Sequence, residues 1–261
     1  MVAALTALAA GWPVGPAHSA EAGGPIDLRI SNVRDSSFTV SWMSEASEPG
    51  EVVWSANGAE PVAAAADARG AGWPSPVHYV QVQGLLPATT YLFDVRSGET
   101  LHTNGGAHYT VTTGPTLPPS SPDSMYGRVM TESGQGAAEA LVYIQLAGEG
   151  GPAALLSALI RPGERGYWLA NLGNARAADG QAMLALAAQD SALLEGQAGR
   201  EQVAAAGATV AQLRDGASLL VLSAPAATAA PPAGDDTTSG QSMAGGESGP
   251  VGAEEAANGG G

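Results

Sequence analysis

Histidine, serine and carboxylate side chains are the groups in this chain that could perform acid–base, nucleophilic or metal chemistry. The four histidines are His18, His78, His102 and His108. No H-x-H, H-E-x-x-H or D-x-H pattern surrounds them, and no G-x-S-x-G motif is present. A metal centre needs three or four convergent ligands, and a serine nucleophile needs a positioned base and carboxylate. The sequence therefore predicts no catalytic site, no metal and no cofactor, and we expect that the protein is not an enzyme.

The acidic and glycine-rich segments give no sharper chemical signal. Asp179-Gly180 and Asp235-Asp236 lack the D-x-[DN]-x-[DN]-G spacing of a calcium loop. The glycine-rich stretches 104–106 and 148–151 are not followed by GK[ST], so they are not phosphate-binding loops. A glycosidase pair cannot be chosen from 25 acidic residues without a cleft.

Three aromatic residues, Trp54, Trp73 and Tyr79, could form a platform for sugar rings. Trp73 stands in the segment Ala-Gly-Trp-Pro-Ser-Pro (71–76), outside the expected strands, and Trp73 with Tyr79 are the candidate ligand contacts. The competing interpretation is that an indole in such a loop covers the edge of the hydrophobic core.

The charge balance excludes one class of partner. The chain carries 25 acidic and 10 basic residues, all ten of them arginine, for a net charge of −15. Nucleic-acid binding needs a concentrated basic surface, so we expect no nucleic-acid partner. The absence of cysteine excludes a disulfide scaffold and a thiol nucleophile.

Alternating apolar and polar residues predict antiparallel strands in residues 25–113. His78 shares the parity of Val80 and is expected at the edge of the core, whereas His108 has the opposite parity to Tyr109 and is expected to face solvent. The expected strands lie near 26–32, 37–43, 50–55, 77–83, 89–97 and 106–113, with a short seventh near 60–66.

Residues 114–124 are rich in proline and serine and predict a semi-rigid spacer between two domains. Beyond it, residues 125–223 are expected to form a second β-sandwich, although the alanine content keeps a helix open in 181–194. The strands expected there lie near 125–131, 138–146, 155–160, 167–172, 183–188, 191–195, 200–204 and 218–222.

The two ends of the chain differ in composition from the middle. Residues 1–20 are small and apolar and predict a signal peptide cut after Ala20, or alternatively after Ala17. No Lys or Arg precedes the apolar run, so an ordinary disordered N-terminus is the alternative. Residues 224–261 contain no aromatic residue and predict a disordered acidic tail rich in glycine, alanine and proline.

The segment Leu86-Pro87-Ala88-Thr89-Thr90-Tyr91 and the upstream run Phe38-Thr39-Val40-Ser41-Trp42 resemble the fibronectin type III family. The resemblance covers residues 25–113. It implies an immunoglobulin-like sandwich with Trp42 in the core and a tyrosine whose hydroxyl bonds back to the preceding corner.

Residues 126–129 (YGRV), 138–144 (AEALVYI) and 166–172 (GYWLANL) resemble the transthyretin-like, or carboxypeptidase regulatory-like, sandwich. Glu139 stands where that family usually has glycine. The resemblance implies an accessory module and no peptidase activity.

The sequence thus predicts an all-β protein of two β-sandwich domains, fibronectin type III-like and then transthyretin-like, with disordered termini. The expected function is non-catalytic binding, adhesion or spacing outside a bacterial cell, either secreted or at the cell surface. The expected partner is an extracellular protein or polysaccharide, and no transmembrane helix is expected. Two alternatives remain: a carbohydrate- or polymer-binding accessory module, and an accessory part of a larger secreted hydrolase, a phosphatase or glycosidase.

Overall fold

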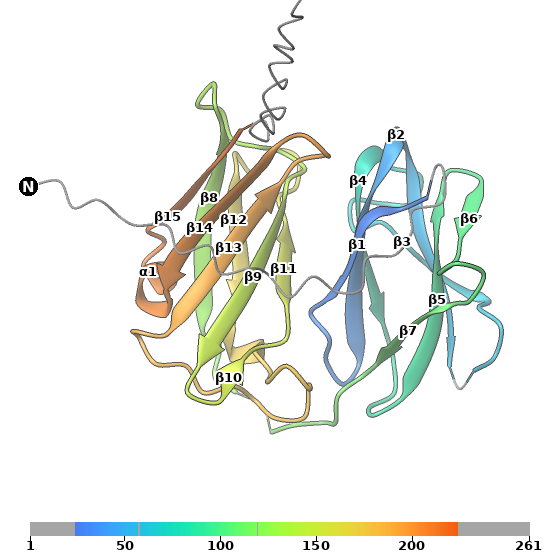
Figure 1. The fold of residues 1–261 in the computed structure, drawn as a ribbon, viewed down its shortest axis with the longest axis horizontal. Coiled ribbons are helices and arrows are strands. Elements are labelled where there is room, and N and C mark those ends of the chain that lie inside the picture. The colour runs from blue at the N-terminus through green and yellow to red at the C-terminus, as the bar shows by residue number, and fades with distance from the viewer. Residues whose placement is uncertain (1–23, 57, 119, 224–261) are drawn as a thin grey trace, which may run out of the picture. The chain divides into compact units, whose positions relative to one another are not determined.

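The structure, a computed structural model, describes residues 24–56, 58–118 and 120–223 and is almost entirely built of β-strands. The predicted signal segment and the predicted acidic tail lie outside the described residues. Two β-sandwiches follow each other along the chain, which confirms the predicted all-β fold class (Figure 1). Residues 24–223 fall within one compact unit.

The first sandwich depends on one long strand that belongs to both of its sheets. The N-terminal half of β2 pairs with β1 and β4, and its C-terminal half pairs with β3 and β5. The register shifts between Met43 and Glu48, where the strand passes from one sheet to the other. The strands are β1 (Ile26–Ser31), β2 (Ser37–Ala56), β3 (Ala63–Ala66), β4 (Pro74–Gln83), β5 (Thr90–Ser97), β6 (Thr100–His102) and β7 (Tyr109–Thr112).

The two strands predicted at 37–43 and 50–55 are therefore one continuous element. Pro49 and Gly50 separate the two apolar runs in the sequence, but the chain bends there without leaving the extended conformation. Glycine is needed at position 50 because a Cβ would collide with the ring of His78. The long strand thus replaces the expected turn with a bend.

The apolar residues of the alternating pattern fill the core of the first sandwich, as the sequence predicted. Phe38, Val40 and Trp42 on β2 are completely buried and meet Val80 and Val82 of β4 in the same cluster. The polar residues between them point to the other face of the sheet.

The corner before β5 is closed as the fibronectin type III resemblance implies. The backbone N–H of Leu86 donates a hydrogen bond of 2.7 Å to the hydroxyl of Tyr91, whose ring is buried. The indole N–H of Trp42 donates to Ser97 Oγ at 2.9 Å, so this buried donor is also satisfied. The corner bond of Tyr91 and the burial of Trp42 were expected from the sequence, and both are present; the bond from Trp42 to Ser97 was not predicted.

The second sandwich consists of a five-stranded and a three-stranded sheet. The larger sheet has the order β10-β9-β13-β14, with β11 also paired to β9, and the smaller one has the order β12-β8-β15. β15 runs parallel to β8. The elements are β8 (Ser124–Thr131), β9 (Leu141–Gly148), β10 (Gly151–Pro152), β11 (Leu156–Leu159), β12 (Tyr167–Asn171), the 3₁₀ turn η1 (Leu172–Asn174), β13 (Ser191–Gln197), β14 (Val203–Thr209), α1 (Val210–Arg214) and β15 (Ser218–Leu222).

Two expectations for this half need correction. The strand predicted at 183–188 is wrong: Met183 makes one isolated bridge to Arg176, and the rest is turn and loop. The helix kept open for 181–194 does not form either. The helix that does form, α1, begins at a capping box in which Thr209 and Gln212 bond each other's backbone N–H groups.

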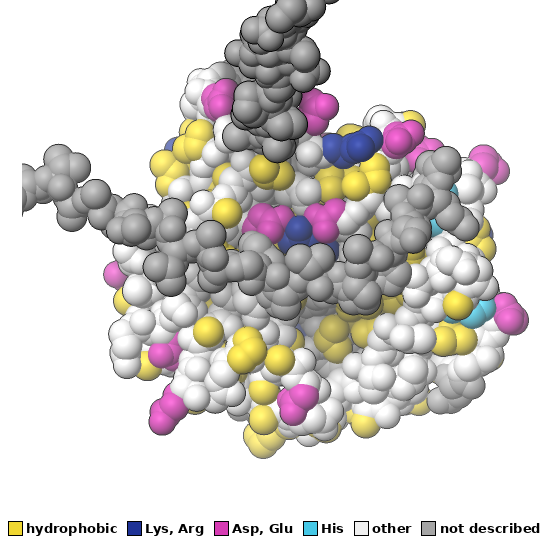
Figure 2. Space-filling model, viewed as in Figure 1, with side chains coloured by type: hydrophobic (Ala, Val, Ile, Leu, Met, Phe, Trp, Pro, Cys, Tyr) yellow, Lys and Arg dark blue, Asp and Glu magenta, His cyan; other side chains and the backbone are white. Residues whose placement is uncertain are grey.

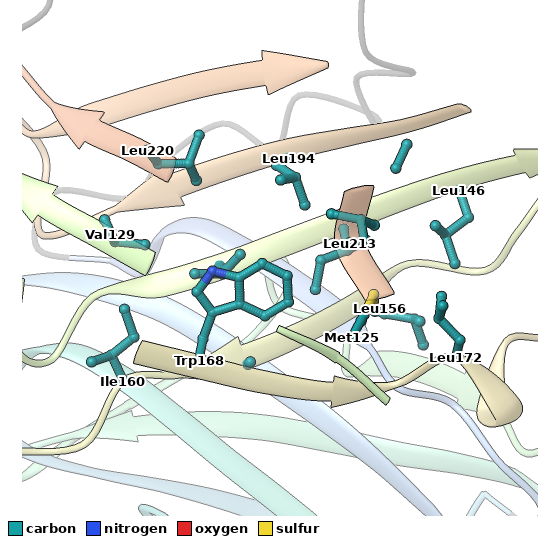
Figure 3. Packing of buried hydrophobic residues seen from close by; sticks show 14 of the residues in the cluster. Met125, Val129, Leu146, Leu156, Ile160, Trp168, Leu172, Leu194, Leu213 and Leu220 are labelled. Carbon is teal, nitrogen blue, oxygen red and sulfur yellow. The ribbon is translucent and has the colours of Figure 1, made fainter. Parts of the chain in front are cut away.

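Leu, Val and Ala side chains from both sheets build the second core around Trp168 (Figure 3). Figure 3 shows the indole lying among Val129, Ile160 and Leu213, and only 3% of Trp168 is exposed. On β8 this pattern buries Met125 and Val129 and leaves Tyr126 and Arg128 on the outer face. The outer face of the small sheet therefore carries large side chains that the core does not use.

Candidate functional site

The two sandwiches are joined by a side chain that behaves like a short strand. The amide of Asn32 donates to the carbonyl of Ser157 and accepts from its N–H, each at 3.0 Å. The backbone N–H of Asn32 donates to the carbonyl of Leu155 at 2.9 Å. Asn32 has φ 50°, a left-handed conformation that asparagine tolerates better than most residues. One residue thus closes part of the free edge of β11.

An apolar cluster with polar side chains around it lies beside this contact. Met43, Val77 and Tyr79 of the first sandwich pack with Leu141 and Tyr143 of the second. The hydroxyl of Tyr143 lies 2.9 Å from Ser41 Oγ, and burial raises its pKa. The guanidinium of Arg29 covers the Tyr143 ring at 4.1 Å and pairs with Glu195 at 2.6 Å.

A buried ion pair anchors a second point of the interface. Arg69 and Asp67 form a salt bridge of 2.8 Å with only 1% of each side chain exposed. Burial acts to raise the pKa of Asp67, but hydrogen bonds from Arg69 and from backbone N–H groups hold it below its usual value. Arg69 also bonds Glu139 of the second sandwich at 3.2 Å.

Glu139 adopts φ 62°, a left-handed conformation that glycine adopts more readily than other residues. Its side chain accepts hydrogen bonds from Arg69 and from Ser75 Oγ, both in the first sandwich. Glu139 thus makes an inter-sandwich contact from a strained backbone position.

The Pro/Ser-rich connector is held at both ends. Arg176 donates to the carbonyl of Pro115 at 2.9 Å, and the N–H of Asp123 donates to the side chain of Asn171 at 3.1 Å. Ser120 bonds the carbonyl of Gly173. The connector therefore lies along the second sandwich and is not a free spacer.

A groove of about 960 Å³ runs between the two sandwiches. One wall is the polar face of β2 and β4, with Thr39, Gln81 and Gln83. The other wall is formed by β11, β12 and β8, with the exposed rings of Tyr126 and Tyr167. Arg34, Arg161 and Glu164 also line it. This volume lies at the upper end of the range for ligand-binding clefts.

Two strand edges border this groove. Four consecutive residues of β11 (156–159) and five consecutive residues around β12 (167–171) line it. Side chains of a strand alternate between faces, so consecutive residues can all line one groove only where the groove runs along the strand's edge. The groove therefore exposes backbone as well as side chains.

The arginines are distributed unevenly over this acidic molecule. Six of the ten pair with a carboxylate within 4.0 Å. The other four, all in the described part of the chain, have no such pair there: Arg34, Arg128, Arg161 and Arg165. Arg34 and Arg161 line the groove. Arg128 covers the ring of Tyr167 at 4.9 Å and donates to the carbonyl of Arg165. On the face shown in Figure 2, by contrast, acidic side chains are spread widely and basic ones are few.

The aromatic residues singled out in the sequence do not form one platform. Tyr79 is 4% exposed and lines the groove, and its hydroxyl donates to the carbonyl of Ser157 at 3.1 Å. Trp54 lies in the other sheet and meets Tyr91 edge-on. Trp73 is half-buried just before β4, does not line the groove, and has a buried indole N–H with no partner in the described residues. Ligand contact by Trp73 and Tyr79 stays a prediction.

The histidines occupy structural positions. His78 is completely buried, more deeply than the core-edge position that its parity predicted, and it stacks on Trp42 at 4.7 Å. Burial lowers the pKa of His78 to about 4. His108 is a quarter exposed and lies between Asp94 at 2.8 Å and Glu60 at 3.3 Å, and the Asp94 hydrogen bond raises its pKa. His102 is buried, and His18 lies outside the described residues.

Within the described ranges, no three His, Asp or Glu side chains are grouped so that they could hold a metal ion. The same part of the chain contains no helix long and apolar enough to cross a membrane.

Comparison with known proteins gives structural likenesses only. No family model and no curated protein matches the chain. Among solved structures, the chicken CNTN1 FN1–FN3 domains share 12% identity over 77% of this chain, with a TM-score of 0.27. This chain covers 66% of that one, just under two thirds. A two fibronectin type III domain segment from chicken tenascin shares 9% identity over 71% of this chain and 98% of its own, with a TM-score of 0.25. Both TM-scores are too low to carry an argument about this chain.

Apart from Tyr79, the residues that build the groove were not identified in the sequence. Gln81 and Gln83 have the parity of a solvent-facing strand surface, and such a pattern does not say what lies opposite. Asn32 is a polar residue after a strand, which is typical of a turn. Only the fold brings these residues next to β11 and β12.

Proposed function

We propose that the protein is a non-catalytic binding protein that acts outside the cell and holds its ligand in the groove between the two sandwiches. The observation that carries the proposal is the construction of the groove. Its two walls come from different sandwiches, and the contacts of Asn32, Tyr143 and Arg69 fix these walls to each other. A preformed cleft loses less conformational entropy on binding than a hinged one.

The chemistry of the groove supports binding rather than turnover. Its walls offer amides, hydroxyls, three tyrosine rings and two arginines. The three described histidines do not line it, and none of the serines that line it has a histidine partner there. The buried contacts of His78 and the carboxylates around His108 account for those two rings in structural terms.

Export by a signal peptide, cleavage near Ala20 and a bacterial cell-surface setting are part of this proposal. They rest on the composition of residues 1–20 and on the acidic charge balance of the chain. The transthyretin-like assignment of residues 125–223 and the domain boundaries drawn from the sequence are likewise proposed. Mass spectrometry of the native protein tests the cleavage, which is expected to leave a mature chain that begins after Ala20 or Ala17.

The binding role is tested on arrays of immobilised glycans and peptides probed with the full chain. A variant with Gln81→Arg and Gln83→Arg fills the polar wall of the groove with two exposed side chains, and Glu99→Arg, in the β5–β6 turn of the first sandwich, is the matched surface control. We expect a ligand class whose signal disappears with the groove variant and persists with the control. Signals that are equal for both variants, or no signal on either array, would refute the proposal.

A further inference from the structure

The free edge of β12 is open to the groove, and the hydrogen bonds between β12 and β8 show which of its backbone groups point outward. Val129 N–H donates to the carbonyl of Gly166, and Leu172 N–H donates to the carbonyl of Asp123. With the antiparallel register of β12 and β8, these bonds mean that the backbone N–H and C=O groups of Trp168 and Ala170 point toward β8. The N–H and C=O groups of Leu169 therefore point away from the sheet, into the side that lines the groove.

These outward groups have no backbone partner among the described residues. The N–H of Tyr167 is used by the carbonyl of Glu164 within the preceding turn. Four outward groups remain without a backbone partner among the described residues: the carbonyl of Tyr167, the N–H and the carbonyl of Leu169, and the N–H of Asn171. An added strand with one residue opposite Leu169 would form hydrogen bonds to all four groups.

The neighbouring edge of β11 shows how this protein closes such a position. There, Asn32 pairs with both the N–H and the C=O of Ser157 and with the carbonyl of Leu155, as a strand residue would. Within residues 24–56, 58–118 and 120–223, no equivalent residue bonds the backbone of Leu169. An exposed, unpaired strand edge is a template for an added chain, and proteins usually cover or charge it.

The charge of the groove selects among chains that could pair there. Arg34 and Arg161 line it, and in the described part of the chain neither guanidinium has an ion pair, while the carboxylate of Glu164 accepts from the backbone N–H of Arg161. Arg128 lies over the ring of Tyr167, which also lines the groove. Partial burial, and secondly the like charge of Arg176, lower the pKa of Arg34. The guanidinium groups of Arg34 and Arg161, which have no ion pair among the described residues, favour an anionic ligand.

We propose that the groove binds an extended acidic peptide segment of another protein, which adds to the edge of β12 opposite Leu169 while its carboxylates meet Arg34 and Arg161. This inference rests on the proposed binding function and names its partner. Backbone pairing supplies the affinity and the acidic side chains supply the selectivity.

The test measures binding of synthetic peptides to the full chain by isothermal titration calorimetry. The probe is a capped peptide of alternating threonine and glutamate, long enough to pair with all five residues of β12. Two matched probes carry lysine in place of glutamate, or N-methyl groups on the backbone nitrogens that would face β12. We expect binding of the acidic probe, a loss on the order of 10-fold on N-methylation, and no binding of the lysine probe.

Variants separate the backbone contribution from the side chains. Leu169→Pro removes the outward N–H at a position where an edge strand tolerates proline, whereas Leu169→Ala keeps it. We expect the proline variant to lose binding and the alanine variant to retain most of it. The double variant Arg34→Gln and Arg161→Gln is expected to weaken binding on the order of 10-fold, while Arg200→Gln, whose side chain pairs with Glu45, is not.

Several outcomes would overturn the inference. Equal binding of the N-methylated probe would exclude strand addition, even if Leu169→Pro failed to fold. Binding of polygalacturonate that depends on the two arginines but not on the β12 edge would assign the groove to an anionic glycan and leave the proposed binding function intact. Binding only after removal of residues 224–261 would identify the acidic tail of this chain as the occupant.

Discussion

Acidification to about pH 4.5 is expected to destabilise the protein through a single buried ring, His78. The ring is completely buried, stacks on Trp42 and lies 2.9 Å from Ser44 Oγ through Nε2. Nδ1 is buried and has no partner in the described residues. A second proton on this ring would therefore be a buried charge without a counter-ion in direct contact.

The magnitude follows from the shift of the pKa. Burial is the main cause that lowers the pKa of His78 from 6.5 to about 4, and the positive charge of Arg69 also lowers it, whereas Asp67 acts in the opposite direction. A lowered pKa means that the unfolded chain binds the proton first, so stability is complete above pH 6.5 and is lost as the pH falls toward 4. The full shift corresponds to about 3 kcal/mol of unfolding free energy.

Urea denaturation followed by tryptophan fluorescence, at intervals between about pH 7 and pH 4.5, measures the slope of the unfolding free energy against pH. The control is His78→Gln, which keeps a polar group near Ser44 but does not titrate. The window avoids Asp67, whose lowered pKa makes its contribution fall away only below 3.8. A slope that is the same in the wild type and in His78→Gln, or an NMR titration of His78 near 6.5, would refute the reasoning.

Three further substitutions test other parts of the fold. Tyr91→Phe removes the acceptor of the Leu86 N–H bond and is expected to reduce the unfolding free energy by about 1 kcal/mol, measured by urea denaturation; an unchanged midpoint would mean that the corner bond contributes nothing. Asn32→Ala leaves both backbone groups of Ser157 unpaired and is expected to cost about 2 kcal/mol and to speed amide hydrogen exchange at Ser157, whereas unchanged exchange would contradict its bridging role. Gly136→Ala places a Cβ against a neighbouring backbone carbonyl, so we expect little folded protein by circular dichroism, and a variant as stable as the wild type would count against this packing.

The core of the first sandwich could be predicted because its pattern is local. Phe38, Val40 and Trp42 alternate with polar residues, and their burial follows from parity alone. The Tyr91 corner depends on a short motif that lies within six residues, so the sequence also indicated it.

The strands of the second sandwich were harder to predict from the sequence because alanine has no strong preference between strand and loop packing. The expected strand at 183–188 contains mainly Ala and Leu, and its Leu184 and Leu186 pack on the core from a loop. The Thr-x-x-Gln pattern at Thr209 is the sequence signal of a capping box, and it marks the start of α1.

The groove could not be predicted because its walls are far apart in the chain. Parity shows that Gln81 leaves the core, but parity is the same for a face in solvent and a face beside another sandwich. Pairing of Asn32 with Ser157 spans 125 residues. Such contacts depend on how two finished sandwiches pack, which no local pattern encodes.

The strand-like contact of Asn32 also makes each sandwich depend on the other while the protein folds. A fragment that ends at residue 113 would expose Met43, Val77 and Tyr79 to water, and the remaining fragment would present the bare edge of β11. The two sandwiches are therefore not portable modules that can be cut apart or shuffled. The chain should melt in one cooperative transition, and a proteolytic cut in the connector should leave its halves associated.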